Sequence, residues 1–346
     1  MFLKSFEYYR GIAIVLIVIG HCYGLSEWIF NSYPERVLAN IITGGTALFV
    51  FISGFLFHQV FYPRFKYSRF MTKKFQKVFV PYLFWSALAL TLTFSTHSSL
   101  PDKFIGPSLS FWDQWIRPIF LSLITGGHFL AYWYIPFIMI MFLLSPLFIR
   151  FIKLERRTQV MVTLGLLFCS ALGQRPVNNI LVLQSVLFFS PVYLFGILCS
   201  IDKEWIYEHL NNKAWLLALG VVLLSMIQSS YYPGAGSYHK PLFMLHAFDI
   251  NIIQKFLLCL LCMVFLHRFE QSDNKILSAL AASSFAIFFI HGWVIKGLFL
   301  IKSWLPFTGG LWLLPVITGL VILGSYGVAV VIKKQFPKHS SLLIGW

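Results

Sequence analysis

Charged side chains are scarce in this sequence, and their scarcity excludes the commonest class of protein. Asp, Glu, Lys and Arg make up 11% of its 346 residues, whereas 58% of the residues are hydrophobic. An average soluble domain carries about 25% charged residues. A chain with less than half that density cannot cover a water-facing surface of its own size. A soluble globular protein is therefore excluded, and a membrane protein is indicated.

Cysteines are also few, and their spacing does not indicate a metal site or a disulfide framework. Cys259 and Cys262 are spaced as C-x-x-C, but they lie inside an apolar segment without a neighbouring ligand residue. We interpret all five cysteines as small packing residues of apolar segments: Cys22, Cys169, Cys199, Cys259 and Cys262. No metal cofactor is expected.

Long apolar blocks are what the sequence does contain. About 20 apolar residues in a helix cross the roughly 30 Å hydrocarbon layer, and a backbone in lipid must satisfy its own hydrogen bonds. The blocks lack the strict alternation of a transmembrane barrel. We predict about ten transmembrane helices, at residues 11–25, 39–61, 78–96, 132–149, 158–173, 181–200, 214–230, 252–267, 277–301 and 309–332. The predicted fold is one all-α integral membrane domain over residues 1–346.

One shorter apolar segment, 111–124, is interrupted by Asp113, Arg117 and Pro118. Charged side chains are costly inside the hydrocarbon layer. We therefore predict that this segment is an interfacial or re-entrant piece and not an eleventh span.

Positive charge is divided unevenly among the predicted loops. Most Lys and Arg residues lie in six segments, near 4–10, 64–77, 150–157, 203–213, 268–275 and 333–338. Cytoplasmic loops carry the excess of Lys and Arg, so both termini are predicted to be cytoplasmic. Because the basic residues form no continuous surface, we expect membrane lipids as partners and no nucleic acid.

Arg10 and His21 form the most informative ionisable pair, in the first predicted helix. Eleven residues at about 100° each end about 20° beyond three full turns, so both side chains share one helix face, about 16 Å apart. Alone, Arg10 would be a cytoplasmic anchor and His21 a packing histidine. Together they predict a site that holds an anionic cofactor at the cytoplasmic surface. Proton chemistry would occur deeper in the membrane, since histidine titrates near neutrality.

The stretch RGIAIVLIVIGH resembles the Arg-(ten residues)-His signature of the membrane acyltransferase-3 family. Similar segments follow in the family's order: LFVFISGFLF at 48–57, KKFQKVFVPYLFW at 73–85, HFLAYWYIPFI at 128–138 and FAIFFIHGWVI at 285–295. The chain departs from the family in having lysines in its basic cluster and a wider spacing after His128. The resemblance implies a ten-helix enzyme that moves an acyl group, commonly acetyl, from cytoplasmic acyl-CoA to an extracytoplasmic acceptor.

The resemblance implies a donor site at the cytoplasmic end of the bundle. Arg10 and three lysines, Lys73, Lys74 and Lys77, would bind the phosphates of acetyl-CoA as positive charges. In α-helical geometry Lys73 and Lys77 would share a face. The alternative interpretation is that these lysines are ordinary positive-inside residues.

Catalytic and acceptor residues are expected deeper in the bundle. His21 would be a general base or a transient acyl carrier, with Arg10 and Ser53 assisting. His291 or His128 would hold the acceptor or stabilise the oxyanion, and Trp133 and Tyr134 would form a wall of the acceptor site. The structural alternatives are a small packing pair for Ser53 and its neighbouring glycine, and interfacial aromatics for Trp133 and Tyr134.

The sequence therefore predicts a transmembrane O-acyltransferase, most simply an O-acetyltransferase, in a bacterial inner membrane. The acceptor stays open among surface polysaccharide, lipid-linked precursor and small secreted molecule, and a periplasmic acceptor protein is a further partner to consider. A transporter or flippase is the first alternative, although the halves show no repeat and intramembrane acids are nearly lacking. A non-catalytic membrane sensor is the second.

Overall fold

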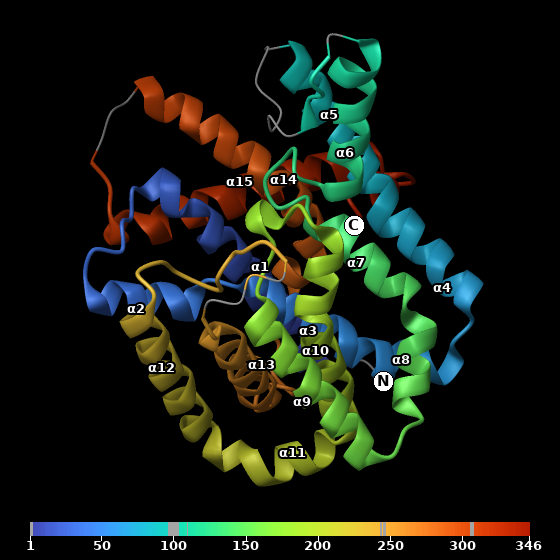
Figure 1. Ribbon diagram of the computed structural model, residues 1–346, viewed down its shortest axis with the longest axis vertical. Coiled ribbons are helices and arrows are strands. Elements are labelled where there is room, and N and C mark those ends of the chain that lie inside the picture. The colour runs from blue at the N-terminus through green and yellow to red at the C-terminus, as the bar shows by residue number, and fades with distance from the viewer. Residues whose placement is uncertain (1–2, 96–103, 109, 243, 245–246, 305–307) are drawn as a thin grey trace.

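The computed structural model describes residues 3–95, 104–108, 110–242, 244, 247–304 and 308–346, and its regular elements are helices (Figure 1). The α-helices of the first half are α1 (Lys4–Ser26), α2 (Tyr33–Ile42), α3 (Gly45–Leu56), α4 (Tyr67–Lys74), α5 (Val80–Ser95), α6 (Arg117–Thr125), α7 (Tyr134–Leu143), α8 (Ser145–Ile152) and α9 (Arg156–Gly173). Those of the second half are α10 (Val182–Ile201), α11 (Lys203–Leu210), α12 (Ala214–Tyr231), α13 (Ile250–His267), α14 (Lys275–Trp304), α15 (Leu314–Gln335) and α16 (Ser340–Leu343). Short π-helical or 3₁₀ turns join several of them: η1 (Phe57–Phe61), η2 (Tyr62–Arg64), η3 (Phe75–Phe79), η5 (Trp112–Ile116), η6 (Val177–Asn179), η7 (Asn211–Lys213) and η8 (Leu311–Leu313).

Eight helical stretches within the described ranges are long and apolar enough to cross a membrane. They are Lys4–Ser26, Tyr33–Arg64, Tyr67–Ser95, Val182–Ile201, Lys203–Tyr231, Ile250–His267, Lys275–Trp304 and Leu311–Gln335. Helices α7 and α8, bent by 54° at their junction, make a ninth if they count as one span. The chain is thus an all-helical membrane protein with eight or nine candidate spans, where the sequence predicted about ten.

The predicted span 158–173 accounts for the difference in number. It forms helix α9, but Arg156, Arg157 and Gln159 in the first turn lower the hydropathy of that helix, and it is not among the candidate spans. Residue 96, the last of the predicted span 78–96, lies outside the described residues.

The segment 111–124 folds as the π-helical turn η5 followed by α6. Pro118 lies in the first turn of α6, directly after η5. Together, the five residues of η5 and the nine of α6 extend about 20 Å, less than the hydrocarbon thickness of about 30 Å. This piece is therefore too short to be a span of its own.

Between α6 and α7 the backbone is irregular over residues 126–133, yet it is packed inside the bundle. Tyr132 is fully buried, and Gly126 has a φ of +67° with the Tyr132 carbonyl 2.4 Å from where a Cβ would be. Non-helical backbone within a membrane protein is tolerated where protein surrounds it or where it lines a cavity. This break brings His128 into the interior of the bundle.

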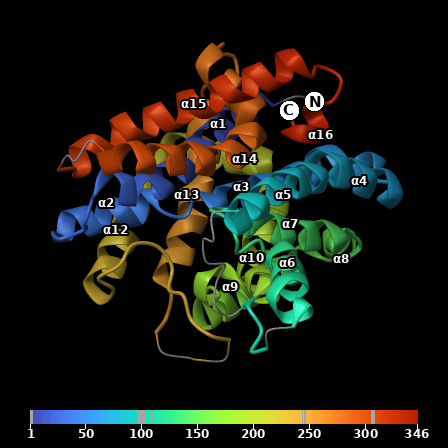
Figure 2. The ribbon, with the colours of Figure 1, turned by 90° about the horizontal axis from the view of Figure 1, so that it is seen from above.

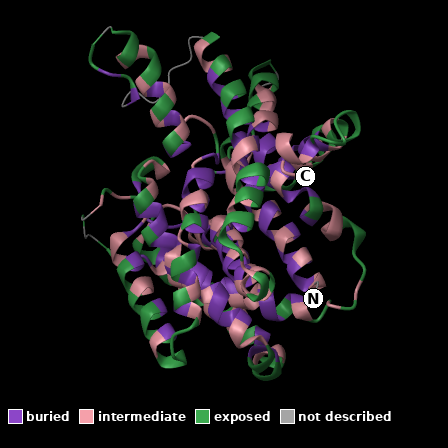
Figure 3. Cartoon of the chain, turned by 90° about the vertical axis from the view of Figure 1, so that its right-hand side faces the viewer, coloured by how far each residue is buried: buried purple, intermediate pink, exposed green. Residues whose placement is uncertain are grey.

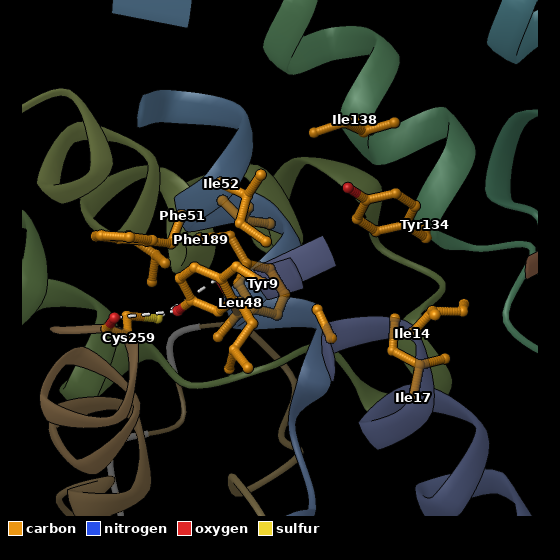
Figure 4. Packing of buried hydrophobic residues seen from close by; sticks show 14 of the residues in the cluster. Tyr9, Ile14, Ile17, Leu48, Phe51, Ile52, Tyr134, Ile138, Phe189 and Cys259 are labelled. Carbon is orange, nitrogen blue, oxygen red and sulfur yellow. Dashed lines mark hydrogen bonds between the residues drawn. The ribbon is translucent and has the colours of Figure 1, made fainter. Parts of the chain in front are cut away.

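Helix α1 lies at the centre of the bundle and packs against α3, α13, α14 and α15. Figure 3 shows buried residues concentrated along the middle of the molecule, with exposed ones on its outer helices. In the core view of Figure 4, Tyr9 of α1 reaches α13, where its hydroxyl donates to the Cys259 carbonyl at 3.1 Å. Outward-facing apolar residues such as Leu223 and Leu323 are exposed, as expected of surfaces that contact lipid.

Helices α3 and α10 approach each other closely because both have glycine at their contact. A Cβ on Gly54 would lie 2.0 Å from the Tyr193 carbonyl oxygen, and one on Gly196 would lie 2.2 Å from that of Phe51. The interpretation of the Ser53–Gly54 pair as a site of close helix packing is thus correct for Gly54.

The two ends of the bundle are held by separate polar contacts. At one end the Glu270 carboxylate accepts hydrogen bonds from the backbone N–H groups of Lys4 and Ser5. At the other end Lys302 forms an ion pair of 2.6 Å with Glu27, and this bond, with one from the Gly309 N–H, holds the pKa of Glu27 below its usual range. Figures 1 and 2 place the N- and C-terminal ends of the chain on the same side of the molecule.

Candidate active site

Arg10 points from α1 into a cavity of about 230 Å³, which we call the inner cavity. Its guanidinium donates to the Ser284 hydroxyl of α14 at 3.0 Å. The cavity is lined by Arg10, Phe49, Ile52, Ser53, Leu56, Phe57, Phe61, Phe70, Lys74, Phe142, Tyr193 and Phe285. The predicted residues Arg10, Ser53 and Lys74 therefore share one space, although 64 positions separate the first from the last in the chain.

Lys74 enters the same cavity from α4. Its ammonium group lies over three aromatic rings, 4.8 Å from the centroid of Phe61, 5.3 Å from Phe70 and 4.4 Å from Phe142. Such cation–π contacts stabilise an ammonium group without neutralising it. Lys74 is also close enough to Arg10 for their charges to repel. Two positive charges therefore converge on a cavity that has no carboxylate among its described lining residues, which is the electrostatics of an anion site.

The other two predicted lysines are placed differently. Lys73 is exposed and lines a neighbouring cavity of about 250 Å³, the outer cavity. Lys77 is exposed and belongs to none of the cavities found among the described residues. Helix α4 ends at Lys74 and the π-helical turn η3 begins at Phe75, so Lys73 and Lys77 lie on two different elements.

His21 and His291 are brought together by the packing of α1 against α14. Their rings meet edge to face with centroids 5.2 Å apart. His291 is fully buried, and its Nδ1 lies 3.1 Å from the Ile287 carbonyl oxygen and 2.8 Å from that of Phe288. A carbonyl can only accept, so Nδ1 carries the proton and Nε2 of the neutral ring has a free lone pair. That Nε2 is buried without a hydrogen-bond partner in the described structure.

The histidine pair lies deeper than the inner cavity. Phe285 lines the cavity, and His291 follows six residues later on α14, about 9 Å further along the helix axis. His21 lies about 16 Å from Arg10 along α1. A ligand held by Arg10 and Lys74 would therefore need a long, thin extension to reach the histidines.

His128 and Tyr132 of the irregular segment lie next to this region. The Tyr132 hydroxyl donates to the Phe289 carbonyl at 3.1 Å and accepts from the Trp293 indole N–H at 3.1 Å. The Nδ1 of His128 donates to the Ser122 carbonyl at 3.0 Å, while its Nε2 is buried without a partner in the described structure. His128 thus repeats the tautomer of His291 and presents another lone pair.

Tyr134 and Trp133 point in different directions. Tyr134 packs on Phe288 of α14, with ring centroids 5.6 Å apart, and its hydroxyl lies near Ser53. Ser53 itself donates to the Phe49 carbonyl of its own helix at 2.8 Å. Trp133 instead lies under the guanidinium of Arg175, 5.1 Å from the ring centroid. Tyr134 therefore belongs to the wall between cavity and histidines, and Trp133 does not.

Sequence reasoning missed three contributors to the site: Ser284, Tyr132 and the phenylalanines around Lys74. A pair of serines at 283–284 in an apolar helix was a signal for Ser284, because buried hydroxyls need partners. The phenylalanines gave no signal, since this chain contains 37 of them.

A helical membrane domain in which half-buried cations line a cavity and two histidines meet beyond it has the parts of a group-transfer enzyme that works within the membrane. The comparison with protein families makes this specific. The acyltransferase-domain model of the acyltransferase 3 family matches residues 3–333, and the chain belongs to that family. It is thus a membrane acyltransferase by family.

Two curated proteins are distantly similar to this chain. The nodulation protein NolL of Sinorhizobium fredii is 25% identical over 210 residues, which cover 57% of this chain and 57% of that protein. NolL of Mesorhizobium japonicum is 25% identical over 181 residues, which cover 49% of this chain and 48% of that protein. The chain therefore spans about half the length of the curated relatives that it matches. No solved structure matches it.

Proposed function

We propose that the protein is a bacterial inner-membrane O-acetyltransferase that moves an acetyl group from cytoplasmic acetyl-CoA to a hydroxyl of an extracytoplasmic glycan. The observation that carries the proposal is the pairing of His21 with His291 beyond a cavity in which Arg10 and Lys74 converge. Acyl-CoA has matching parts: anionic phosphates at one end, a thin flexible arm, and the reactive thioester at the other end.

The orientation that we propose for the protein in the membrane is based on the distribution of Lys and Arg among its loops. Arg10 and Lys74 lie at the end of the bundle that carries the basic loops, and such loops face the cytoplasm in most membrane proteins. Both termini would then be cytoplasmic, and the donor would enter from the compartment that contains acyl-CoA. If α9 crosses the bilayer as well, the span number reaches the even value that this orientation requires.

At the far end of the arm, His21 would act as a general base. Its imidazole takes the proton of an acceptor hydroxyl as the hydroxyl oxygen attacks the thioester carbonyl. The new C–O bond gives a tetrahedral intermediate, from which the C–S bond breaks. The departing thiolate then receives the proton from the imidazolium. One ester and one free CoA thiol result, and no cofactor besides the donor is consumed.

The tautomers of His291 and His128 suit an acceptor rich in hydroxyl groups. Each ring donates through Nδ1 to a backbone carbonyl and leaves Nε2 as an acceptor. A neutral ring in that tautomer cannot donate through Nε2 to an oxyanion, so we assign these two residues to holding hydroxyl groups and not to the oxyanion role. From the sequence, His291 or His128 could either hold the acceptor or stabilise the oxyanion, and we propose the first of these roles for both.

The test is label transfer in sealed vesicles with radiolabelled acetyl-CoA supplied to the cytoplasmic face. Base-labile label should appear in the glycan fraction with the wild-type protein and be lost with His21→Ala and Arg10→Ala. Full activity of His21→Ala would exclude this mechanism. Label that stays on the protein when acceptor is withheld, and that requires His21, would instead make His21 the acyl carrier.

A measurement of acetyl-CoA binding distinguishes the acyltransferase proposal from the transporter alternative. Acetyl-CoA should raise the melting temperature of the purified protein, because a ligand that binds only the folded state stabilises it. A transporter or flippase for glycans would show no such shift. The same absence of a shift, together with absent label transfer, would contradict the acyltransferase proposal.

A further inference from the structure

Two cavities at the basic end of the bundle share a wall, and this wall divides the donor site into two parts. Phe61 and Phe70 line both the inner cavity and the outer cavity. We propose that the outer cavity binds the 3′-phosphoadenosine end of CoA, so that the enzyme distinguishes CoA from CoA lacking its 3′-phosphate. This inference rests on the proposed function and goes beyond it by assigning a separate nucleotide subsite.

The charge of the outer cavity favours a multiply phosphorylated ligand. Its lining contains four basic residues, Arg64, Lys66, Arg69 and Lys73, and no acidic one. A phosphate monoester carries about −1.5 to −2 charges near neutral pH. Arginine can bind it with two parallel hydrogen bonds, and lysine adds a point charge.

The apolar part of the lining suits a flat base. Phe61, Phe65 and Phe70 form the remaining wall with Val60, and the rings of Phe65 and Phe70 lie 5.5 Å apart at their centroids. Aromatic side chains next to basic ones are the usual combination for binding a nucleobase with its phosphates. Lys74, which lies over the Phe61 and Phe70 rings from the inner side, would then meet the diphosphate where the ligand passes this wall.

A third cavity, separate from the inner and outer cavities, is also lined by Arg10 but is a poorer nucleotide site. This larger space, of about 600 Å³, lies between α1, α14 and η1 and is lined by Leu3, Phe6, Glu7, Arg10, Leu56, Gln59, Val60, Ala281 and Ala282. Arg10 is its one cation within the described lining, and the Glu7 carboxylate beside it would repel phosphates. Charge complementarity therefore places the nucleotide in the outer cavity.

Anionic lipid headgroups offer similar phosphate chemistry at this surface, so the experiment must separate the two sources. Binding of acetyl-CoA, acetyl-dephospho-CoA and adenosine 3′,5′-bisphosphate is measured by calorimetry on the full chain, in nanodiscs of zwitterionic lipid and again with added anionic lipid. The double variant Lys66→Gln/Arg69→Gln is compared with Lys153→Gln/Arg157→Gln. The control removes two exposed basic residues that line none of the cavities found among the described residues.

The wild type should bind acetyl-CoA at least tenfold more tightly than acetyl-dephospho-CoA, since a charge-assisted hydrogen bond lost from a site corresponds to about a tenfold change or more. Lys66→Gln/Arg69→Gln should abolish that preference, leave the affinity for acetyl-dephospho-CoA within about twofold, and lose the bisphosphate, while the control keeps all three affinities. The inference would be overturned by equal affinity of the wild type for both CoA forms, by equal losses in both double variants, or by a bisphosphate site that anionic lipid fully displaces. Each of these leaves the acyltransferase function intact, whereas no binding of acetyl-CoA at all would remove both.

Discussion

Two lysines inside the bundle, Lys74 and Lys255, have opposite surroundings. Lys255 of α13 is 2% exposed, and its ammonium donates to the Asn40 carbonyl at 2.8 Å and the Ile41 carbonyl at 3.1 Å. These carbonyls belong to the last turn of α2, where helical partners are lacking and a positive charge is favoured. Lys74 lies over aromatic rings, next to Arg10 and facing a cavity.

These different surroundings give the two lysines different roles: Lys255 stabilises the fold, and Lys74 is placed to bind a ligand. The charge of Lys255 is used within the fold, because it completes the hydrogen bonding of a helix that ends inside the protein. The half-buried ammonium group of Lys74 lies over ring faces and faces the inner cavity, where we propose that an anion binds. A cation buried in a membrane protein is a candidate functional residue. Whether the protein itself supplies hydrogen-bond acceptors to that cation indicates whether its role is structural or ligand-binding. Four predictions test this comparison.

The largest effect is expected at the histidine pair beyond the cavity. His21→Ala should lower the rate of acetyl transfer by about 10²- to 10⁴-fold, the contribution of a general base, with little change in melting temperature or in acetyl-CoA affinity. His209→Ala is the control, since His209 is exposed and stacks on Trp205 of α11. A loss of donor binding in His21→Ala, equal to its loss of rate, would contradict a base that acts only in the chemical step.

The next largest effect concerns stability in the Lys255 region. Lys255→Met keeps the length of the side chain but removes the donor to the Ile41 carbonyl and leaves the Asn40 carbonyl with the longer hydrogen bond from Asn251 at 3.4 Å, at a cost of about 1–3 kcal/mol. The melting temperature of the purified protein should fall clearly, whereas the affinity of the remaining folded protein for acetyl-CoA should not change. A stable variant that had lost its donor would place Lys255 in the binding site instead.

Lys74 should give the reverse result. Lys74→Gln is expected to raise the Kd for acetyl-CoA about tenfold or more, the equivalent of one lost charge-assisted contact. Its melting temperature should stay the same or rise, because no buried oxygen loses a partner. Lys77→Gln, which changes an exposed lysine of the next turn, should weaken binding less. Equal effects of the two variants would indicate a general surface charge and not a cavity ligand.

The smallest effect is expected at Ser284, which orients Arg10. Ser284→Ala removes the 3.0 Å hydrogen bond from Arg10, together with the bond from the Ser284 hydroxyl to the Ala281 carbonyl of its own helix, and should raise the KM for acetyl-CoA about two- to tenfold without a change in kcat. Ser283→Ala provides the matched control, because the Ser283 hydroxyl donates to the Ala279 carbonyl of its own helix at 2.7 Å. A lower kcat in Ser284→Ala would assign the Arg10–Ser284 contact to the chemical step.

The sequence by itself determined the features that depend on local periodicity. A backbone in lipid must close its own hydrogen bonds, so an apolar run such as 277–301 has to be helical, and it lies within α14. In the same way 11–25 lies within α1, and eleven helical residues put Arg10 and His21 on one face wherever that helix packs. Where a run was short or charged, as at 111–124 and 158–173, local information determined a helix but not whether it crosses the membrane.

Only the tertiary structure decided which of these residues meet. His21 and His291 are 270 positions apart, and the packing of α1 against α14 brings their rings together. The packing of α4 against its neighbours decided that Lys74 lines the inner cavity, whereas the adjacent Lys73 lines the outer one. The physical reason is that helix periodicity is fixed by hydrogen bonds between near neighbours. Cavities and side-chain pairs instead depend on the packing of helices that are distant in sequence.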